Sequence, residues 1–423
     1  AVYLAWFNAA IGATDLSQLT RDNILYEGSE RDTQIERIKD SIRAMPAELQ
    51  DEHYGLMAQA LAGAVTSLNP EVKPRVVRHA LRVVGDHPQA APLRRIQSLY
   101  DDLIEDEIHL RLTLDGPVAI GADQPFAVVL SLRYTNAVDR ETDGFSKYLQ
   151  NNVWVNLGAG STWVNYRDRL ERSIEQSFGD GFRIEAVSFF ESMYPSSSVI
   201  ERGEHGWQEK PLAYIVLRAN DASIERVPPV SMDLDFIDQT GPVILAIESN
   251  SPAVDGASEG GARPVRGLVV SQVVDVRTAA DGEVTLEIEA SGRGVIPELH
   301  VLLKGIDAPL DGFVIAEDGV QAHPFGVSDS DPADSTSPFR RIDPNLEEEM
   351  VYAGRDEDGV YRKVMTRSWT VRYVQEGNGL VGASFVVPTL VAGLQGEVLN
   401  RHFDDLDLVV ITGASIPVDG GFG

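Results

Sequence analysis

The pentad Asp-Gly-Phe-x-Ile occurs twice in the chain, at residues 180–184 and 311–315, which lie 131 residues apart. Shifting the chain by this interval without a gap also places Val153 on Val284. A motif repeated in this way indicates one structural unit used twice. Asp-Gly permits a tight turn with positive φ, and Phe and Ile two residues apart face the same side of a strand. The motif is therefore interpreted as structural, and it predicts two related β-rich units.

Composition sets limits on the size of the protein and on its partners. A chain of 423 residues is long enough for about three domains. It contains no cysteine, which excludes disulfides, thiolate zinc sites and a cysteine nucleophile. Its net charge of −29 repels nucleic acid and anionic lipid at long range. We therefore expect a protein partner and no nucleic-acid partner.

The N-terminal segment is the most apolar part of the chain. Its first twelve residues are largely apolar, whereas a membrane-spanning helix needs about 20 such residues. Residues 1–29 are predicted to be an apolar arm or the stub of an anchor or signal region, which would place a membrane tether near the N-terminus. The alternative, that they form a helix or strand packed on the body of the protein, stays open.

Residues 30–106 have the periodicity of helices. Ile35, Ile38 and Ile42 recur at spacings of three and four, so they share one helix face. Pro46 should end or restart that helix. Three further apolar stripes follow, and connections this short favour four antiparallel helices.

From residue 107 the apolar period changes to two. Leu110, Leu112 and Leu114 alternate with polar residues, as a half-buried strand requires. Similar strands recur to about residue 400, and a helical stripe precedes each pentad. These patterns predict one unit over 107–250, a second over 265–400 and a C-terminal tail over 401–423. Residues 249–264, rich in Ser, Pro, Gly and Ala, are interpreted as the linker between the units.

This succession of strands and turns, with a closing strand followed by an Asp-rich tail, resembles bacterial extracytoplasmic proteins built from immunoglobulin-like β-sandwiches. The resemblance covers about residues 107–400. The expected fold class is mainly β with α: an N-terminal helical region followed by two related β-sandwich-like units, each with an inserted helix. The resemblance implies sandwiches that serve as spacers or docking surfaces, located in the periplasm or at the cell surface and often beside a membrane anchor.

Two arrangements of residues are candidates for catalysis. Ser258 lies in a G-x-S-x-G sequence, but a nucleophile elbow needs a strand before the serine and a helix after it, and the linker offers neither. Asp233 with Asp235, and likewise Glu287 with Glu289, lie two apart on predicted strands, so each pair projects from one face. Such a pair could hold calcium or perform acid–base chemistry, although an exposed polar face explains it equally simply. No catalytic residue is predicted.

Two further sets of residues are candidates for binding. Asp329, Asp331 and Asp334 offer oxygen ligands at loop spacing, and they are the predicted calcium site, although the glycine and terminal glutamate of a calcium loop are missing. Trp154, Trp163, Trp207 and Trp369 could stack on sugars, but tryptophan on a strand more often packs in a core.

The functional expectation follows from the repeat, the acidic composition and the incomplete catalytic patterns. It is a non-enzymatic extracytoplasmic scaffold or partner-docking protein, membrane-tethered near its N-terminus. One alternative is a carboxylate-dependent hydrolase or carbohydrate-binding protein that uses Asp233 and Asp235 in a cleft lined by Trp154 or Trp207. The other is a structural subunit of a large assembly, with residues 1–29 as the docking arm.

Overall fold

The structure, a computed structural model, describes most of the chain between residues 34 and 417. The described ranges are 34–65, 68, 70, 73–85, 87–102, 106–135, 138, 143–156, 161–190, 201–202, 207–238, 241–275, 282–304, 306, 312–323, 325, 339–340, 356, 358–375, 384–386, 389–390, 396–402 and 415–417. The predicted arm 1–29 and the predicted calcium ligands Asp329, Asp331 and Asp334 lie outside them. The prediction of a mainly β chain is confirmed, because the described strands form several antiparallel sheets.

Helices occupy the first part of the described chain. They are α2 (Gln34–Arg43), α3 (Ala47–Ala64), α4 (Lys73–Val84), the short 3-10 helix η3 (Pro88–Ala90) and α5 (Ala91–Asp102). Pro46 lies between α2 and α3 and takes the extended conformation that precedes a helix. Apolar side chains such as Met57, Leu61 and Val77 form a common core between these helices.

The first sheet has the strand order β1-β2-β7-β5-β14, with β6 paired to β7. Its strands are β1 (Ile108–Asp115), β2 (Pro125–Thr135), β5 (Phe182–Phe189), β6 (Glu201–Arg202), β7 (Trp207–Ala219) and β14 (Phe339–Arg340). Between β2 and β5 the chain forms η5 (Asp143–Leu149), the hairpin β3 (Val153–Asn156) and β4 (Ser161–Val164), and helix α7 (Tyr166–Phe178). Leu170, Ile174 and Phe178 of α7 are buried against one face of this sheet.

The second sheet has the strand order β13-β15-β11-β10-β18. Its strands are β10 (Val265–Asp275), β11 (Glu283–Gly294), β13 (Phe313–Ala322), β15 (Val364–Gln375) and β18 (Gly396–His402), and the short helix α8 (Leu299–Leu302) follows β11. Two small antiparallel pairs are β12 (Leu303–Lys304) with β17 (Thr389–Leu390), and β16 (Ser384–Val386) with β19 (Ser415–Pro417). On β11, Val284, Leu286 and Ile288 are buried and alternate with less buried residues, as a period of two requires.

Four strands of each sheet are arranged in the same way: across the sheet, the first strand in sequence is followed by the second, the fourth and the third. In the first sheet, the neighbours are β1, β2, β7 and β5; in the second, β10, β11, β15 and β13. Phe182 begins β5 opposite Ala219, the last residue of β7, and Phe313 begins β13 opposite Gln375, the last residue of β15. The repeated pentad therefore occupies the same corner of each sheet.

The gap-free shift of 131 residues is wrong outside that corner. It matches Val153 on β3, which belongs to a separate two-stranded hairpin, with Val284 on β11, in the middle of the second sheet. By position in the sheet, the counterpart of β11 is β2. The expected turn geometry also differs between the copies, because Gly312 has φ of +81° whereas Gly181 is not among the positive-φ glycines of the described chain.

Residues 249–264, interpreted as a linker, are packed against the first sheet. This segment lies along the turn between β1 and β2 and is held there by backbone hydrogen bonds, among them Asp255 N to Val118 O at 2.8 Å and Ile120 N to Asp255 O at 3.1 Å. A Cβ atom on Gly116 would lie 2.8 Å from Pro264, so the two segments touch at a glycine. Backbone pairing therefore holds the segment against the first sheet.

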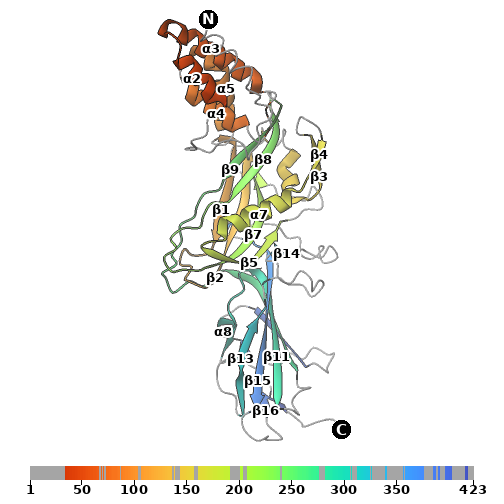
Figure 1. Cartoon of the computed structure of the whole chain (residues 1–423). Helices are drawn as coiled ribbons and strands as arrows, with labels where there is room; N and C mark the ends of the chain where they lie inside the picture. The colour runs from red at the N-terminus through yellow and green to blue at the C-terminus, as the bar shows by residue number, and fades with distance from the viewer. Residues whose placement is uncertain are drawn as a thin grey trace.

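The elements follow one another along an elongated molecule, with helices at one end, the first sheet in the middle and the second sheet at the other end (Figure 1). One apolar cluster joins the two sheets. It combines Val129 and Val216, from the face of the first sheet that does not pack on α7, with Leu286, Trp369 and other residues of the second sheet. Phe339 of β14 also pairs in parallel with Val187 of β5. Because β14 lies between β13 and β15 in sequence, the two sheets are linked by backbone as well as by side chains.

A two-stranded ribbon connects the helices to the first sheet. It consists of β8 (Ser231–Asp238) and β9 (Gly241–Glu248), and it extends from the first sheet toward the helices (Figure 1). Met232 and Leu234 of β8 belong to the core of the first sheet, whereas Val243 and Leu245 of β9 belong to the helical core. The ribbon therefore buries apolar side chains in two separate cores.

Candidate functional site: the ionic junction between the two sheets

The strongest polar constellation surrounds Arg362, which lies two residues before β15. Its side chain is 1% exposed and contacts Asp115, at the end of β1, whose side chain is 0% exposed. Asp115 accepts hydrogen bonds from Arg362 Nε at 3.0 Å and from Arg362 Nη2 at 2.7 Å. These two residues are 247 positions apart in sequence, so the contact exists only because the two sheets are docked.

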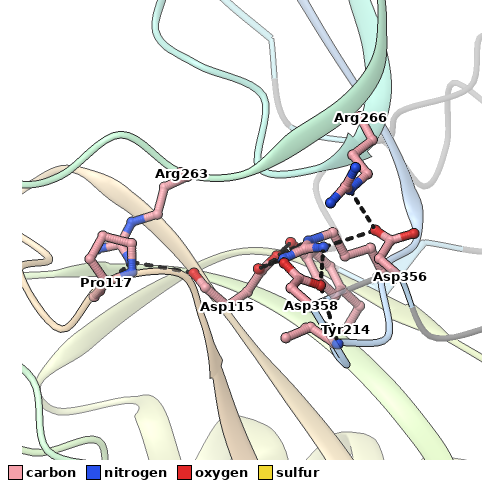
Figure 2. A network of polar contacts seen from close by, with 9 residues as sticks. Asp115, Pro117, Tyr214, Arg263, Arg266, Asp356 and Asp358 are labelled. Atoms are coloured by element: carbon pink, nitrogen blue, oxygen red, sulfur yellow. Dashed lines mark hydrogen bonds and ion pairs between the residues drawn. The ribbon is translucent and has the colours of Figure 1, made fainter.

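Two more carboxylates complete the site. Arg362 Nη1 donates to Asp356 at 2.8 Å and to Asp358 at 2.9 Å, and Nη2 donates to Asp358 at 2.5 Å. Figure 2 shows Asp115, from the end of β1, close to Asp356 and Asp358, which come from the segment before β15. A guanidinium has five N–H donors. The contacts above engage all of its nitrogens, so Arg362 has no free donor for an anionic substrate.

The neighbours of the site neutralise and orient the acids. Tyr214 on β7 donates its hydroxyl proton to Asp115 at 2.6 Å, and Arg293 lies 3.2 Å from Asp356. Arg263 donates to the carbonyl oxygens of Pro117 at 2.6 Å and Ala119 at 2.7 Å, on the opposite side of Asp115 (Figure 2). The segment 249–264, the first sheet and the second sheet therefore meet at one place.

The pKa shifts favour the charged forms of Arg362 and Asp358 and the protonated form of Tyr214. Burial alone would lower the pKa of Arg362, but hydrogen bonds from its guanidinium to Asp358, Asp115 and Asp356 outweigh burial and raise it. The hydrogen bond from Arg362 lowers the pKa of Asp358. Burial, followed by the charge of Asp115, raises the pKa of Tyr214 well above its usual value. Each of these shifts moves a pKa away from 7, whereas a general acid or base working near pH 7 has a pKa near that pH.

A second ionic cluster crosses between the sheets at Arg218 of β7. It ion-pairs with Glu185 of β5 at 3.1 Å and donates a hydrogen bond to Glu298, the residue before α8. Arg367 of β15 lies 3.1 Å from the same carboxylate of Glu298. Burial raises the pKa of Glu298, but Arg367 and Arg218 overcome this effect and lower it. The apolar cluster between the sheets is thus accompanied by two sets of ion pairs.

Asp235, one of the carboxylates considered for catalysis, does not lie in an open site. Asp235 is buried and accepts hydrogen bonds from the hydroxyl groups of Tyr148, at 2.9 Å, and Tyr166, while Lys147 Nζ lies 3.0 Å from it. Burial, followed by these contacts with Asp235, raises the pKa of both tyrosines, so both stay protonated donors. The cluster joins η5 and α7 to β8, which is a packing role.

The other sequence candidates lie apart from one another. Ser258 donates its hydroxyl proton to the carbonyl oxygen of Asp255 at 2.7 Å and accepts from Gly260 N at 3.3 Å, inside an exposed turn. Glu287 and Glu289 are exposed on β11. Trp369 is buried in the core, but Trp154 and Trp163 are exposed, so the expectation of core packing is wrong for these two.

Sequence reasoning missed the junction. One local signal was present, because Asp358 and Arg362 lie four residues apart in a strongly acidic stretch. Nothing in the sequence connects either residue to Asp115. Within the described ranges, no group of three or more His, Asp or Glu side chains could hold a metal ion. No helix there is long and apolar enough to cross a membrane.

Comparison with known proteins adds no family. No family model matches the chain, and no curated protein matches it at a significant level.

Proposed function

We propose that the chain is a non-enzymatic extracytoplasmic scaffold or partner-docking protein, held near a membrane by its N-terminal region, that keeps its parts at a fixed separation. Its two sheets are two copies of one β-sandwich-like unit, as their common strand order suggests. The observation that carries the proposal is the buried contact between Arg362 and Asp115. A buried ion pair fixes one arrangement of its partners, because any other arrangement leaves a charge unpaired.

The alternative of a carboxylate-dependent hydrolase has little support from the geometry. Asp235 has hydrogen bonds or ion pairs on both of its oxygens and lies in a packed cluster with two tyrosines and Lys147. The purified chain is expected to turn over no member of a broad ester, glycoside and peptide panel. Turnover that is lost in Asp235→Asn while the fold is retained would favour the hydrolase.

Fixed separation can be tested by distance measurement, because the chain has no cysteine and accepts two engineered labels. Spin labels are placed at Gln176→Cys on α7, which packs on the first sheet, and at Glu287→Cys on β11 of the second sheet; both positions are exposed. Double electron–electron resonance should give one narrow distance distribution. A control pair, Gln176→Cys with Ala222→Cys, has both labels on the part of the chain that contains the first sheet. Its distance distribution gives the width that is expected for a rigid structure.

The width of the distance distribution distinguishes a rigid spacer from two loosely joined sheets. A distribution between the sheets as narrow as the control supports the proposal, and it should broaden in Arg362→Met while the control pair stays narrow. A broad distribution in the unsubstituted chain would contradict the proposal.

A further inference from the structure

The hairpin of β3 and β4 has one face packed on the protein and one face open. Val153 and Val155 pack against the core of the first sheet, and Val164 is buried. On the opposite face, Trp154 and Trp163 are direct cross-strand partners, 56% and 62% exposed. They are the only aromatic residues among the exposed large apolar side chains of the described ranges.

The tryptophans are held in place by their surroundings. Their rings meet edge to face, with centroids 4.9 Å apart and planes at 62°. At the base of the hairpin, the backbone N–H of Asn152 donates to the side chain of Asn165 at 2.9 Å, and Arg167 N donates to Gln150 O at 3.3 Å. The hairpin therefore presents both rings in a preorganised arrangement.

The charge distribution around the hairpin is unusual for this chain. Between Lys147 and Arg167 the sequence contains no charged residue, although the whole chain carries −29 and is 24% charged. A hairpin without charged residues that exposes two tryptophans is suited to the boundary between lipid headgroups and acyl chains, where the indole ring is buried and its N–H stays hydrated. A strongly acidic protein can approach such a boundary closely only where its own surface is neutral and the lipid carries no net negative charge.

Two other occupants fit less well. A stable protein interface buries about 800 Å² on each partner, and two strands of four residues each offer little of that. A flat sugar platform needs nearly coplanar rings, whereas these planes are inclined at 62°.

We infer that the outer face of the β3–β4 hairpin is a contact for the interfacial region of a zwitterionic lipid bilayer, with Trp154 and Trp163 as the inserting side chains. Two indole rings give a weak and reversible contact, so stable attachment requires a second anchor. The hairpin then orients the molecule on the surface. The inference stands on the hairpin alone and does not depend on the scaffold proposal.

The test uses the full chain carrying Trp6→Phe, which removes the tryptophan of the N-terminal segment. It is mixed with phosphatidylcholine vesicles, with and without brominated acyl chains, and with vesicles containing phosphatidylglycerol. Brominated lipid should quench tryptophan fluorescence. The quenching should disappear in Trp154→Ala/Trp163→Ala, and the partition coefficient should fall by about tenfold or more because two large apolar side chains no longer insert. Binding should weaken as phosphatidylglycerol is added.

Control variants test whether the loss of partitioning is specific to the two tryptophans. Val118→Ser removes another exposed apolar side chain and should leave partitioning unchanged, whereas Trp154→Phe/Trp163→Phe should retain part of it. Circular dichroism verifies that each variant is folded. Equal quenching in the double alanine variant, tighter binding to anionic vesicles, or quenching by neutral oligosaccharides in place of lipid would each overturn the inference.

Discussion

At the scale of single residues, the decisive feature is a guanidinium whose donors all meet acids. Asp115 and Arg362 are both almost completely buried. Taking two charges out of water is costly, and their attraction offsets this cost only when the geometry is good and the remaining polar atoms are satisfied. Tyr214 and Asp356 meet that condition here. We therefore expect the pair to act mainly by excluding other arrangements of the sheets.

Removal of the guanidinium should be strongly destabilising. Arg362→Met leaves Asp115 buried without a counter-ion, and the free energy of unfolding should fall by about 3–5 kcal/mol. Urea denaturation followed by circular dichroism measures the change. Adding Asp115→Asn to this variant should recover part of the loss, because that buried charge is then removed.

The matched control is Arg372→Met on β15. Arg372 ion-pairs with Glu283 at 2.8 Å and with Asp318, and its side chain is 38% exposed. Exposed pairs contribute about 0–1 kcal/mol, so this variant should differ little from the unsubstituted chain. Similar losses in the two variants would show that burial of the Arg362 cluster has no special effect.

At the scale of elements, the two pentads combine one sequence with two turn conformations. Both place a phenylalanine at the first position of a strand, and Phe182 and Phe313 are both buried. The preceding glycines differ, because Gly312 lies in the left-handed region with φ of +81° and Gly181 does not. The strand position is therefore shared, whereas the local turn depends on what precedes it.

The same substitution should have opposite effects at the two corners. Gly312→Ala should destabilise the protein by about 1–2 kcal/mol, because a side chain is strained in the left-handed region. Gly181→Ala should be neutral or stabilising by up to about 1 kcal/mol, because alanine reduces the freedom of the unfolded chain. A Cβ atom on Gly181 would lie 3.7 Å from Ile224, an ordinary contact. Urea midpoints of the two variants provide the comparison, and a larger loss for Gly181→Ala would contradict it.

At the scale of the whole molecule, stability depends on junctions between parts that are distant in sequence. The ribbon of β8 and β9 joins the helices to the first sheet, and two ionic clusters and an apolar cluster join the two sheets. The carboxylates of these junctions make the assembly sensitive to acid. Both Asp358 and Glu298 have lowered pKa values in the folded protein.

The direction of this pH dependence follows from linkage. A carboxylate whose folded pKa is below its unfolded value, about 4 for Asp and Glu, stabilises the protein above that unfolded value. The stabilisation is lost as the pH falls through the folded pKa. Urea midpoints should therefore be steady from about pH 7 to 5 and decline below about pH 4. Glu298→Gln should start lower at pH 7 and decline less steeply, whereas parallel curves would exclude this residue as a source of acid sensitivity.

The sequence by itself determined the local structure wherever one short periodic pattern is enough. Val284, Leu286 and Ile288 face inward because a strand alternates, and Leu170, Ile174 and Phe178 share a face because a helix repeats at 3.6 residues. Only the tertiary structure decided that Asp115 meets Arg362, that residues 249–264 lie along a turn, and that Trp154 and Trp163 stay exposed. Periodicity indicates which side chains of one helix or strand face the core. These three features depend instead on how separate elements dock. Docking is set by the packing and charge of surfaces whose residues are hundreds of positions apart.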